Sequence, residues 1–394
     1  MPKLTIEQLP LSGKRVFVRA DLNVPLEGGT VTDDTRLRAV IPTMRYVLDA
    51  GASVVLASHL GRPKGGPDPK YSLAPVAERL RVLLERPVPL APDCVGPSTA
   101  AQAQALKPGE VLLLENLRFH PEEEKNDDGF ARQLAQLADC YVDDAFAAAH
   151  RAHASIAAIT RHLQPAAAGL LMQRELAALG RILESPERPL VALLGGAKVS
   201  DKVALVEHLI GKVDALVIGG GMAFTFLRAL GHSIGRSLVE PERIETARAA
   251  LEAARRRGVQ LTLPVDVVVA DGVDSDGGRA VGIREIPDAQ MGLDIGPRTT
   301  ERFAAVLKSA RTIVWNGPMG VFEKPPFAAG TLAVARAVAE ATAFSVIGGG
   351  DTIAAVNMAG VADRIGYIST AGGAFLEFLE GRSLPGVDAL TEAR

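Results

Sequence analysis

Three glycines, an aspartate and a threonine form the stretch GGGDT, residues 348–352, directly after a short apolar run. A glycine turn lets backbone N–H groups come close to a ligand. A helix that begins at Asp351 and Thr352 would favour an anion at its N-terminus. The stretch matches neither the GxxxxGK[ST] pattern of P-loops nor the GxGxxG pattern of dinucleotide-binding folds. Taken alone, it is more typical of a plain connection between a strand and a helix.

A second glycine turn, GGAKVSDK at residues 195–202, adds positive charge. Lys198 and Lys202 are four residues apart and therefore share one face of the predicted helix. Together with the glycine amides and the helix dipole, they would attract phosphate groups. The carboxylate of Asp351 would repel those phosphates unless a cation lay between them, which indicates Mg²⁺ bound by one carboxylate and by phosphate oxygens. The second half of the chain is therefore typical of a magnesium–nucleotide site.

Cationic side chains follow the apolar runs of the first half. They are Arg19, Arg36, His59, Arg62, Arg118 and Arg151. A single arginine is most often a solvated surface residue, but several at the strand ends of one parallel sheet would form one anion-binding surface. Asp21 and Asn23 add groups that can bind hydroxyls. The set predicts a small substrate with a carboxylate or phosphate at its ends and a hydroxyl between them.

The elements that would position these side chains are short apolar runs, each followed by a polar or glycine-rich turn and a helix-like segment. The runs are RVFV, SVVLAS, VLLLE and CYVDD in the first half, and LVALL, ALVIG, TIVWN, FSVIG and IGYIST in the second. This alternation predicts parallel sheets covered on both faces, whose ligands bind outside the carboxyl ends of the strands. Residues 260–286 depart from it, and their Val/Thr-rich runs predict a small β excursion near the second sheet.

The length of 394 residues exceeds one ordinary core and predicts two domains. Leucines and isoleucine at helical spacing before Pro186 predict a linking helix over residues 171–185. The expected fold class is α/β, with two doubly wound, Rossmann-like parallel-sheet domains joined by this helix. The first domain would cover residues 1–170 and the second residues 186–376.

Composition excludes several function classes. A net charge of −3 gives no general case for nucleic-acid or membrane binding, and no apolar stretch is long enough to span a bilayer. The N-terminal MPKLTIEQLP lacks a signal core, and only two cysteines are present, so a cytoplasmic protein is expected. The histidines at positions 120, 150, 153 and 162 lack a convincing spacing for a metal site and are interpreted as hydrogen-bonding or surface residues.

Long motifs run through the whole chain in a fixed order. They are RADLNVP (19–25), TDDTR (32–36), SHLGRP (58–63), LLENLRF (113–119), AHRAHAS (149–155), GGAKVSDK (195–202), IGGGMAFTFL (218–227), GLDIGP (292–297), WNGPMGVFE (315–323), GGGDT (348–352) and LEFLEG (376–381). On these motifs the chain resembles the phosphoglycerate kinases. The resemblance implies reversible phosphoryl transfer from 1,3-bisphosphoglycerate to Mg–ADP, which gives 3-phosphoglycerate and ATP. It also implies a monomer with these small molecules as its partners.

The resemblance also assigns roles to residues. The phosphoglycerate would be bound by Asp21, Asn23, Arg36, His59, Arg62, Arg118 and Arg151. The nucleotide would be bound by Gly196, Ala197, Lys198, Lys202, Gly220, Gly221, Gly292, Asn316, Pro318, Glu323, Gly349, Gly350, Asp351 and Thr352, with Asp351 as the Mg²⁺ ligand. The transferred phosphoryl group would be surrounded by Arg36, Lys198, Lys202, Gly372 and Gly373. Residues 377–394 would pack back on the first domain.

The chain departs from the family pattern at two places. Ala371 stands where the family usually has a glycine, and an alanine would be strained there if the position needed a positive φ. Ala147 and Ala148 stand where the family usually has a glycine and a hydroxyl residue, so a hydroxyl contact to the substrate would be lost.

The implied reaction needs no general base, because its nucleophile is an ionised β-phosphate oxygen and its leaving group is a carboxylate of low pKa. Catalysis would consist of alignment and charge neutralisation, with closure about the linking helix to exclude water. Two alternatives remain at this point. An NAD-dependent oxidoreductase would need the missing GxGxxG pattern, and a non-catalytic binding protein of the same fold is disfavoured by the presence of both Arg36 and Lys202.

Overall fold

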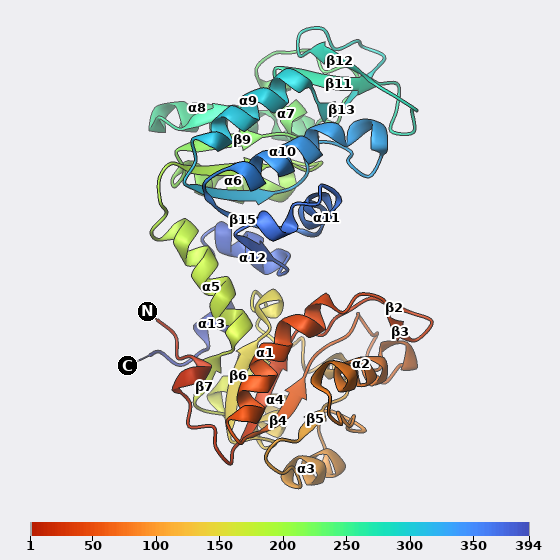
Figure 1. The fold of residues 1–394 in the computed structure, drawn as a ribbon, viewed down its shortest axis with the longest axis vertical. Coiled ribbons are helices and arrows are strands. Elements are labelled where there is room, and N and C mark those ends of the chain that lie inside the picture. The colour runs from red at the N-terminus through yellow and green to blue at the C-terminus, as the bar shows by residue number, and fades with distance from the viewer. Residues whose placement is uncertain (1, 394) are drawn as a thin grey trace. The chain divides into compact units, whose positions relative to one another are not determined.

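The computed structural model describes residues 2–393, which form two compact units (Figure 1). The N-terminal unit extends to Leu176 and takes up the chain again from Ser383. The C-terminal unit is Ala177–Arg382. The expected boundary for the returning segment was 377, so residues 377–382 group with the C-terminal unit instead. The reason is that helix α12 (Gly373–Leu379) packs on helix α6 (Val203–Ile210) of that unit.

The N-terminal unit contains one five-stranded parallel sheet in the order β5-β4-β1-β6-β7. Its strands are β1 (Arg15–Ala20), β4 (Ser53–Ala57), β5 (Val111–Leu113), β6 (Cys140–Asp144) and β7 (Ala166–Ala168). The four predicted runs form β1, β4, β5 and β6, and β4 to β6 are buried along their whole length. Such continuous apolar character is typical of a sheet covered on both faces. β7 was not predicted, because Ala-Ala-Ala carries no strand preference.

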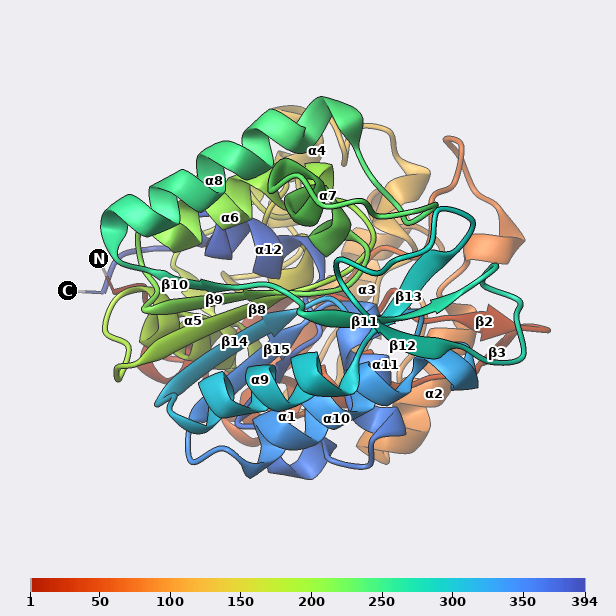
Figure 2. The same ribbon diagram turned by 90° about the horizontal axis from the view of Figure 1, so that it is seen from above.

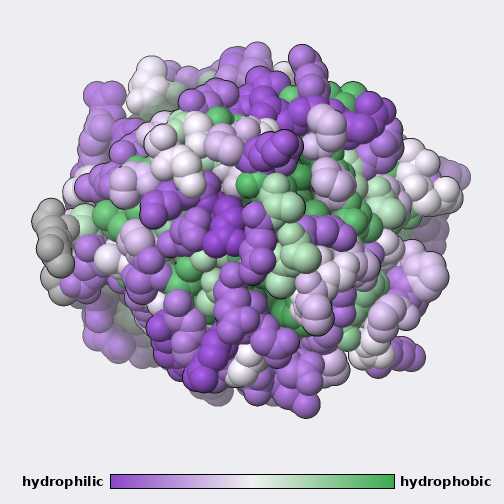
Figure 3. Space-filling model, turned by 90° about the horizontal axis from the view of Figure 1, so that it is seen from below, coloured by the Kyte–Doolittle hydropathy of each residue, from purple (hydrophilic) through white to green (hydrophobic). Residues whose placement is uncertain are grey.

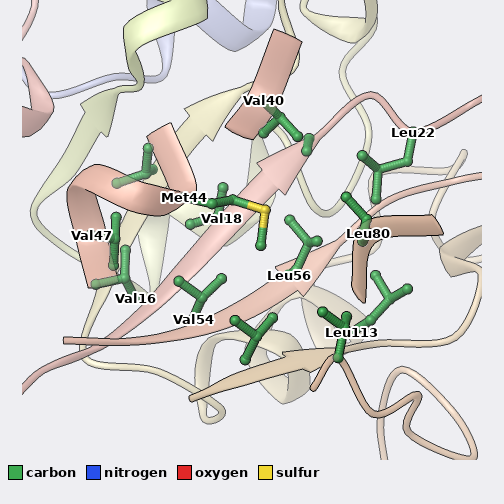
Figure 4. Packing of buried hydrophobic residues seen from close by; sticks show 14 of the residues in the cluster. Val16, Val18, Leu22, Val40, Met44, Val47, Val54, Leu56, Leu80 and Leu113 are labelled. Carbon is green, nitrogen blue, oxygen red and sulfur yellow. The ribbon is translucent and has the colours of Figure 1, made fainter. Parts of the chain in front are cut away.

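Helices cover this sheet. They are α1 (Thr35–Asp49), α2 (Ala74–Leu84), α3 (Pro97–Gln104), α4 (Asp128–Ala135) and the short α13 (Pro385–Asp388), and a small hairpin of β2 (Leu26–Glu27) and β3 (Thr30–Val31) precedes α1. Figure 4 shows Val40 and Met44 of α1 packed over Val16, Val18 and Leu56 of the central strands. Each fully buried aliphatic side chain contributes about 1.5–3 kcal/mol. This core holds the strand ends, and therefore the loops that follow them, in fixed positions.

The C-terminal unit contains a six-stranded parallel sheet in the order β10-β9-β8-β14-β15-β16. Its strands are β8 (Leu190–Leu194), β9 (Ala215–Ile218), β10 (Gln260–Thr262), β14 (Thr312–Asn316), β15 (Phe344–Gly348) and β16 (Tyr367–Ser369). The five predicted runs of the second half form five of these strands. The fold class of two doubly wound parallel-sheet domains is confirmed, since both strand orders reverse direction beside the first strand.

Helices lie on both sides of this sheet, as Figure 2 shows. α6, α7 (Met222–Ala229) and α8 (Ile244–Arg257) are on one side, and α9 (Pro297–Lys308) and α10 (Ala329–Glu340) are on the other. α11 (Gly350–Met358) follows β15 directly, and α12 follows β16. The turns GGGDT and TAGGA therefore each connect the carboxyl end of a strand to a helix. Both turns lie where ligands bind in this class of fold.

The predicted β excursion is present as a three-stranded antiparallel sheet in the order β12-β11-β13. Its strands are β11 (Asp266–Ala270), β12 (Arg279–Gly282) and β13 (Met291–Ile295). Residues 260–262, which were assigned to the excursion, instead form β10 and pair with β9 of the main sheet. Pro264 follows β10, and the excursion begins after it. The sequence pattern could not separate the two, because both pieces are short apolar runs.

Helix α5 (Leu170–Leu183) corresponds to the predicted linking helix, and the division between the two units falls within it. None of the helices in residues 2–393 combines enough length and apolar character to cross a bilayer. Figure 3 shows one face of the molecule, on which hydrophilic residues cover most of the area and hydrophobic residues appear between them.

Candidate functional sites

In the N-terminal unit, the predicted substrate residues follow the carboxyl ends of neighbouring strands. Asp21 and Asn23 follow β1, His59 and Arg62 follow β4, Arg118 follows β5, Arg151 follows β6, and Arg36 lies in the first turn of α1. The strand order reverses between β1 and β6, and the crevice at such a point is where doubly wound sheets bind ligands. The fold therefore collects residues that are far apart in the sequence along one edge of a sheet.

Arg36 is held by direct hydrogen bonds. Its Nη1 donates to Asp21 Oδ2 over 2.8 Å and to the carbonyl oxygen of Asn23 over 3.1 Å. Asn23 Oδ1 in turn accepts from the backbone N–H of Gly61 at 2.8 Å. These contacts join the loops after β1 and β4 and orient Arg36, whose side chain is about one-third exposed (36%). The remaining guanidinium donors of Arg36 are available to an anion.

Arg118 lies in a concentration of positive charge. Its Nη1 donates to the carbonyl oxygen of Gly61 over 2.8 Å. Burial lowers the pKa of Arg118, Glu124 opposes that shift, and the charges of Arg19 and Arg151 add to it. Arg118 Nε also lies 3.3 Å from Glu124 Oε1, which balances part of this charge. The remaining like charges raise the electrostatic energy, and an anion bound between them would lower it. The geometry is that of an anion site.

His59 lies within the same field. It is buried, and desolvation lowers its pKa well below the ordinary value, with Arg19 and Arg118 as the next causes. The ring is therefore neutral at pH 7, so it can bind an anion only through an N–H and not through a full charge. The buried His153 is similar: its pKa falls to about 3, first through burial and then through Arg19, Arg118 and Arg151.

The two remaining predicted residues are more exposed. Arg151 donates from Nε to His150 Nε2 over 3.2 Å. Within the described part of the chain, Arg62 makes no hydrogen bond or ion pair. Ala148, at the departure from the family pattern, is buried against Ala145 and Ile156. The alanine therefore has a packing role at a position where a hydroxyl was expected.

The C-terminal unit has a pocket of about 290 Å³ beside its own point of strand reversal, between β8 and β14. Eight of the predicted nucleotide residues line it: Gly196, Ala197, Gly220, Gly221, Gly292, Pro318, Glu323 and Asp351. Its other walls are largely apolar and include Phe224, Leu238, Val273, Met291 and Val321. Apolar walls with a few polar groups are typical of a site for a flat aromatic ligand such as a nucleobase. Phe224 and Val321 lie within the quoted motifs but were assigned no role, and Leu238, Val273 and Met291 lie outside every motif.

The absence of side chains at two glycines lets the backbone segments of this pocket come together. Gly220 has φ +64°, and a Cβ there would lie 2.7 Å from the backbone nitrogen of Gly196. Gly349, which precedes α11, has φ +97°, and a Cβ there would lie 2.7 Å from Asn316 Nδ2. Asn316 Nδ2 itself donates to the carbonyl oxygen of Gly348 over 2.7 Å. A larger residue at Gly220 would push apart backbone segments of the pocket, and one at Gly349 would displace the Asn316 amide.

Lys202 is almost fully buried, with 8% of its surface exposed. Its Nζ donates to the carbonyl oxygen of Gly195 over 2.6 Å and to that of Asn316 over 3.1 Å. Burial lowers its pKa from 10.5 to about 8, against the charges of Asp201 and Asp351. The ammonium group therefore has carbonyl partners but lacks a full counter-charge. An incoming phosphate would supply one and raise the pKa again.

Asp351 lies on the wall of the pocket in the first turn of α11 and is exposed. One exposed carboxylate beside a phosphate-binding turn fits Mg²⁺, which commonly takes one or two protein carboxylates and completes its shell with substrate oxygens and water. The neighbouring Thr352 has a structural role, because its Oγ1 accepts the backbone N–H of Gly317 at 2.7 Å. Lys198 is exposed at the start of the turn that leads to α6.

Gly372 and Gly373 follow β16 and begin α12. Gly372 has φ +57°, which a glycine adopts without strain. Ala371 is buried and is not among the residues of the described chain with positive φ. The strain considered for this alanine is therefore absent.

One group of side chains outside both sites was not expected from the sequence. His120 Nε2 lies 2.7 Å from Asp93 Oδ1, and the thiol of Cys94 lies within 4.8 Å of both ligand atoms. Asp93 and Cys94 are adjacent in the loop before α3, and His120 lies 26 residues later along the chain, so only the fold shows that they are close together. Asp93 Oδ1 also accepts the backbone N–H of Cys94 at 2.6 Å. The contacts agree with the interpretation of His120 as a hydrogen-bonding histidine.

Comparisons with known proteins agree with this geometry. The family model for phosphoglycerate kinase matches residues 6–382. The phosphoglycerate kinase of Moorella thermoacetica is 58% identical over 393 residues, with both chains covered completely. The chloroplastic phosphoglycerate kinase of Volvox carteri is 55% identical over 97% of this chain and 84% of its own. The solved phosphoglycerate kinase of Coxiella burnetii aligns with a TM-score of 0.93 at 45% identity, covering 98% of each chain. The chain therefore belongs to the phosphoglycerate kinase family, the phosphotransferases that use a carboxyl group as acceptor and exchange a phosphoryl group between 1,3-bisphosphoglycerate and ADP.

Proposed function

We propose that the N-terminal unit binds 3-phosphoglycerate or 1,3-bisphosphoglycerate and that the C-terminal unit binds the magnesium nucleotide. The observation that carries this division is the contrast between the two strand-end sites. One site gathers Arg36, Arg118 and Arg151 around a neutral His59. The other is a glycine-lined pocket of about 290 Å³ with apolar walls. The first suits a small, doubly anionic molecule, and the second suits a nucleobase and its phosphates.

In the N-terminal unit, the phosphoglycerate binds through Asp21, Asn23, Arg36, His59, Arg62, Arg118 and Arg151. The arginines pair with the phosphate and carboxylate groups. Asn23 is fixed through Gly61 and, with Asp21, binds the hydroxyl. Arg62 and Arg151 are exposed and have few protein contacts, so an anion gives them the partner that the protein does not.

In the C-terminal unit, the nucleotide binds through the pocket residues together with Lys198, Lys202, Asn316, Gly349, Gly350 and Thr352. Asp351 is the protein ligand of Mg²⁺. When bound, Mg²⁺ supplies charge neutralisation to the phosphate oxygens. The backbone N–H of Ser200 donates to Glu240 Oε2, and α6 begins directly after Lys202. These two features hold Lys202 in position below the glycine turn.

The transferred phosphoryl group is stabilised by Arg36, Lys198 and Lys202 and by the backbone N–H groups of Gly372 and Gly373. In the ATP-forming direction, a β-phosphate oxygen of ADP bonds to the phosphorus as the bond to the carboxylate oxygen of 1,3-bisphosphoglycerate breaks. The nucleophile is already ionised, so no residue of the chain has to remove a proton. The cationic side chains neutralise charge on the equatorial oxygens during transfer.

Further parts of the proposal concern the whole molecule. α5 acts as a hinge, the protein is a monomer, and it works in the cytoplasm in glycolysis, gluconeogenesis or carbon fixation. Size-exclusion chromatography with light scattering tests the monomer, and scattering with and without both ligands tests the hinge.

The experiment that tests the function is turnover of 3-phosphoglycerate with Mg–ATP, measured as ADP release in a coupled assay. We expect turnover that requires both substrates and Mg²⁺. Calorimetry of each substrate alone tests the two binding sites separately. A protein that binds both ligands without turnover would be a binding protein of the same fold, and binding of NAD in place of Mg–ADP would contradict the nucleotide assignment.

A further inference from the structure

Arg19 is a charged residue in an unusual environment. It lies in β1 and is fully buried. A guanidinium stays protonated in proteins and has donors but no acceptor. Arg19 directs its donors to three acceptors: Nε to Ser155 Oγ at 2.8 Å, Nη1 to the carbonyl oxygen of Ala20, and Nη2 to His59 Nδ1 at 3.3 Å. Because the side chain is inaccessible, Arg19 cannot touch a ligand, and it acts on one only through these partners or through the field of its charge.

The Ser155 contact gives the guanidinium a fixed orientation. Ser155 Oγ lies 2.6 Å from Glu123 Oε1, and the backbone N–H of Ser155 donates to Glu123 Oε2 over 2.9 Å. Glu123 is fully buried. The hydroxyl has one proton, which it donates to the carboxylate, and its lone pairs accept from Arg19. Glu123 therefore serves as the counter-charge of Arg19 through Ser155 and fixes the orientation of the Arg19 guanidinium.

The contact with His59 has only one chemically consistent form. Since Arg19 Nη2 can only donate, His59 Nδ1 must accept, and an Nδ1–H would direct two donors at each other. The alternative of a doubly protonated ring is disfavoured by the same neighbour, because burial and then the charge of Arg19 lower the pKa of His59 well below the ordinary value. The one proton of the neutral ring is then on Nε2.

We infer that Arg19 is a positioning residue that fixes His59 as the Nε2–H tautomer, so that this histidine presents a hydrogen-bond donor to an anionic oxygen of the phosphoglycerate. The inference rests on the proposed function in one respect, namely that His59 contacts that ligand. It explains how a neutral histidine can bind an anion. The Nδ1–H tautomer would direct the lone pair of Nε2 at a negatively charged oxygen and repel it.

The decisive measurement is the tautomer of His59 in the unmodified protein. In ¹⁵N-labelled enzyme without ligands, two-bond ¹H–¹⁵N correlation spectra distinguish a protonated from an unprotonated ring nitrogen, and the variant His59→Gln assigns the signals. We expect a protonated Nε2 and an unprotonated Nδ1 from pH 6 to 8. A protonated Nδ1 would overturn the inference, whatever the ligand affinities are.

Variants then test whether Arg19 is the cause. In Arg19→Met, the His59 signals should shift toward a mixture of tautomers, and affinity for 3-phosphoglycerate should fall in proportion to the lost Nε2–H fraction, about twofold for an equal mixture. Arg19→Lys keeps a cationic donor and should restore most of the Nε2–H population. Arg15→Met, which breaks the exposed Arg15–Asp139 pair at the other end of β1, is the matched control and should leave both readouts unchanged.

A mutant cycle separates this inference from the proposed function. If Arg19 acts through His59, Arg19→Met should weaken 3-phosphoglycerate binding in the wild type but have little further effect in His59→Ala. An equal loss in both backgrounds would mean that Arg19 acts through its charge or through the fold and not through His59, and would overturn the inference. If His59→Ala binds 3-phosphoglycerate normally while the spectra show Nε2–H, the assignment of His59 to the ligand fails and the tautomer assignment stands.

Discussion

The burial of Lys202 leads to a prediction in which loss of a side chain that we propose to be catalytic stabilises the protein at neutral pH. We consider Lys202→Met, which keeps the length and apolar stem of the side chain and removes its ammonium group. In the structure this group is hidden from water, and it donates to the carbonyl oxygens of Gly195 and Asn316. The substitution therefore removes a buried charge and also leaves two carbonyl groups without this donor.

The magnitude follows from these two effects. Lowering the pKa from 10.5 to about 8 means that the folded state disfavours the charged form of Lys202 by about 3 kcal/mol. Loss of the two hydrogen bonds costs about 1 kcal/mol each. At pH 7, where both folded and unfolded states carry the proton, the variant should therefore be more stable by about 1 kcal/mol.

The effect depends on pH with a definite sign. Between pH 8 and 10.5, the unfolded state binds the proton of Lys202 and the folded state does not, so the wild type gains stability as the pH rises. At pH 9.5 the gain amounts to about 2 kcal/mol. The variant has no such group, and its advantage should disappear or reverse there. Other titrating groups cancel in the difference between the two proteins.

The assay uses Trp315, the only tryptophan in the chain, which is buried in β14 of the C-terminal unit. Urea unfolding followed by its fluorescence at pH 7 and at pH 9.5 reports the stability of the unit that contains Lys202. Lys198→Met is the matched control, because Lys198 is exposed four residues earlier and should change stability little at either pH. A stability difference for Lys202→Met that is the same at both pH values would refute the argument from the buried charge.

Three further predictions test the proposed site. Asp351→Ala should weaken Mg–nucleotide binding and turnover while leaving 3-phosphoglycerate binding intact, and an unchanged dependence of activity on Mg²⁺ would contradict the metal role. Arg62→Ala or Arg151→Ala should raise KM for 3-phosphoglycerate by an amount equivalent to about 1.5–3 kcal/mol, and calorimetry that instead found weaker ATP binding would reverse the assignment of the two units. Arg36→Ala and Lys202→Ala should each lower kcat on the order of 10³-fold with smaller changes in either binary Kd. The double variant should lose less than the product of the two single losses, because one transition state uses both side chains. Fully multiplicative losses confined to substrate binding would contradict this shared role.

Much of the fold could be predicted from local sequence patterns. Runs such as SVVLAS and TIVWN are apolar apart from their end residues, and β4 and β14 are buried along their whole length. Burial on both faces requires helices on both sides, so the runs by themselves indicated doubly wound sheets. The strand Ala166–Ala168 and the separation of Gln260–Thr262 from the excursion were not predictable in this way. Both depend on pairing with a neighbouring strand and not on the strand's own composition.

The sequence also determined which residue types stand at the strand ends, because turns and motifs are local. It therefore predicted a basic site in the first half and a glycine-rich phosphate site in the second. Only the tertiary structure decided what each side chain does there. It buried Arg19 behind His59, turned Lys202 toward two carbonyl oxygens, and lined the pocket of the C-terminal unit with apolar side chains such as Phe224. Burial and partners arise from contacts between segments distant along the chain, and those contacts set the protonation states on which the chemistry depends.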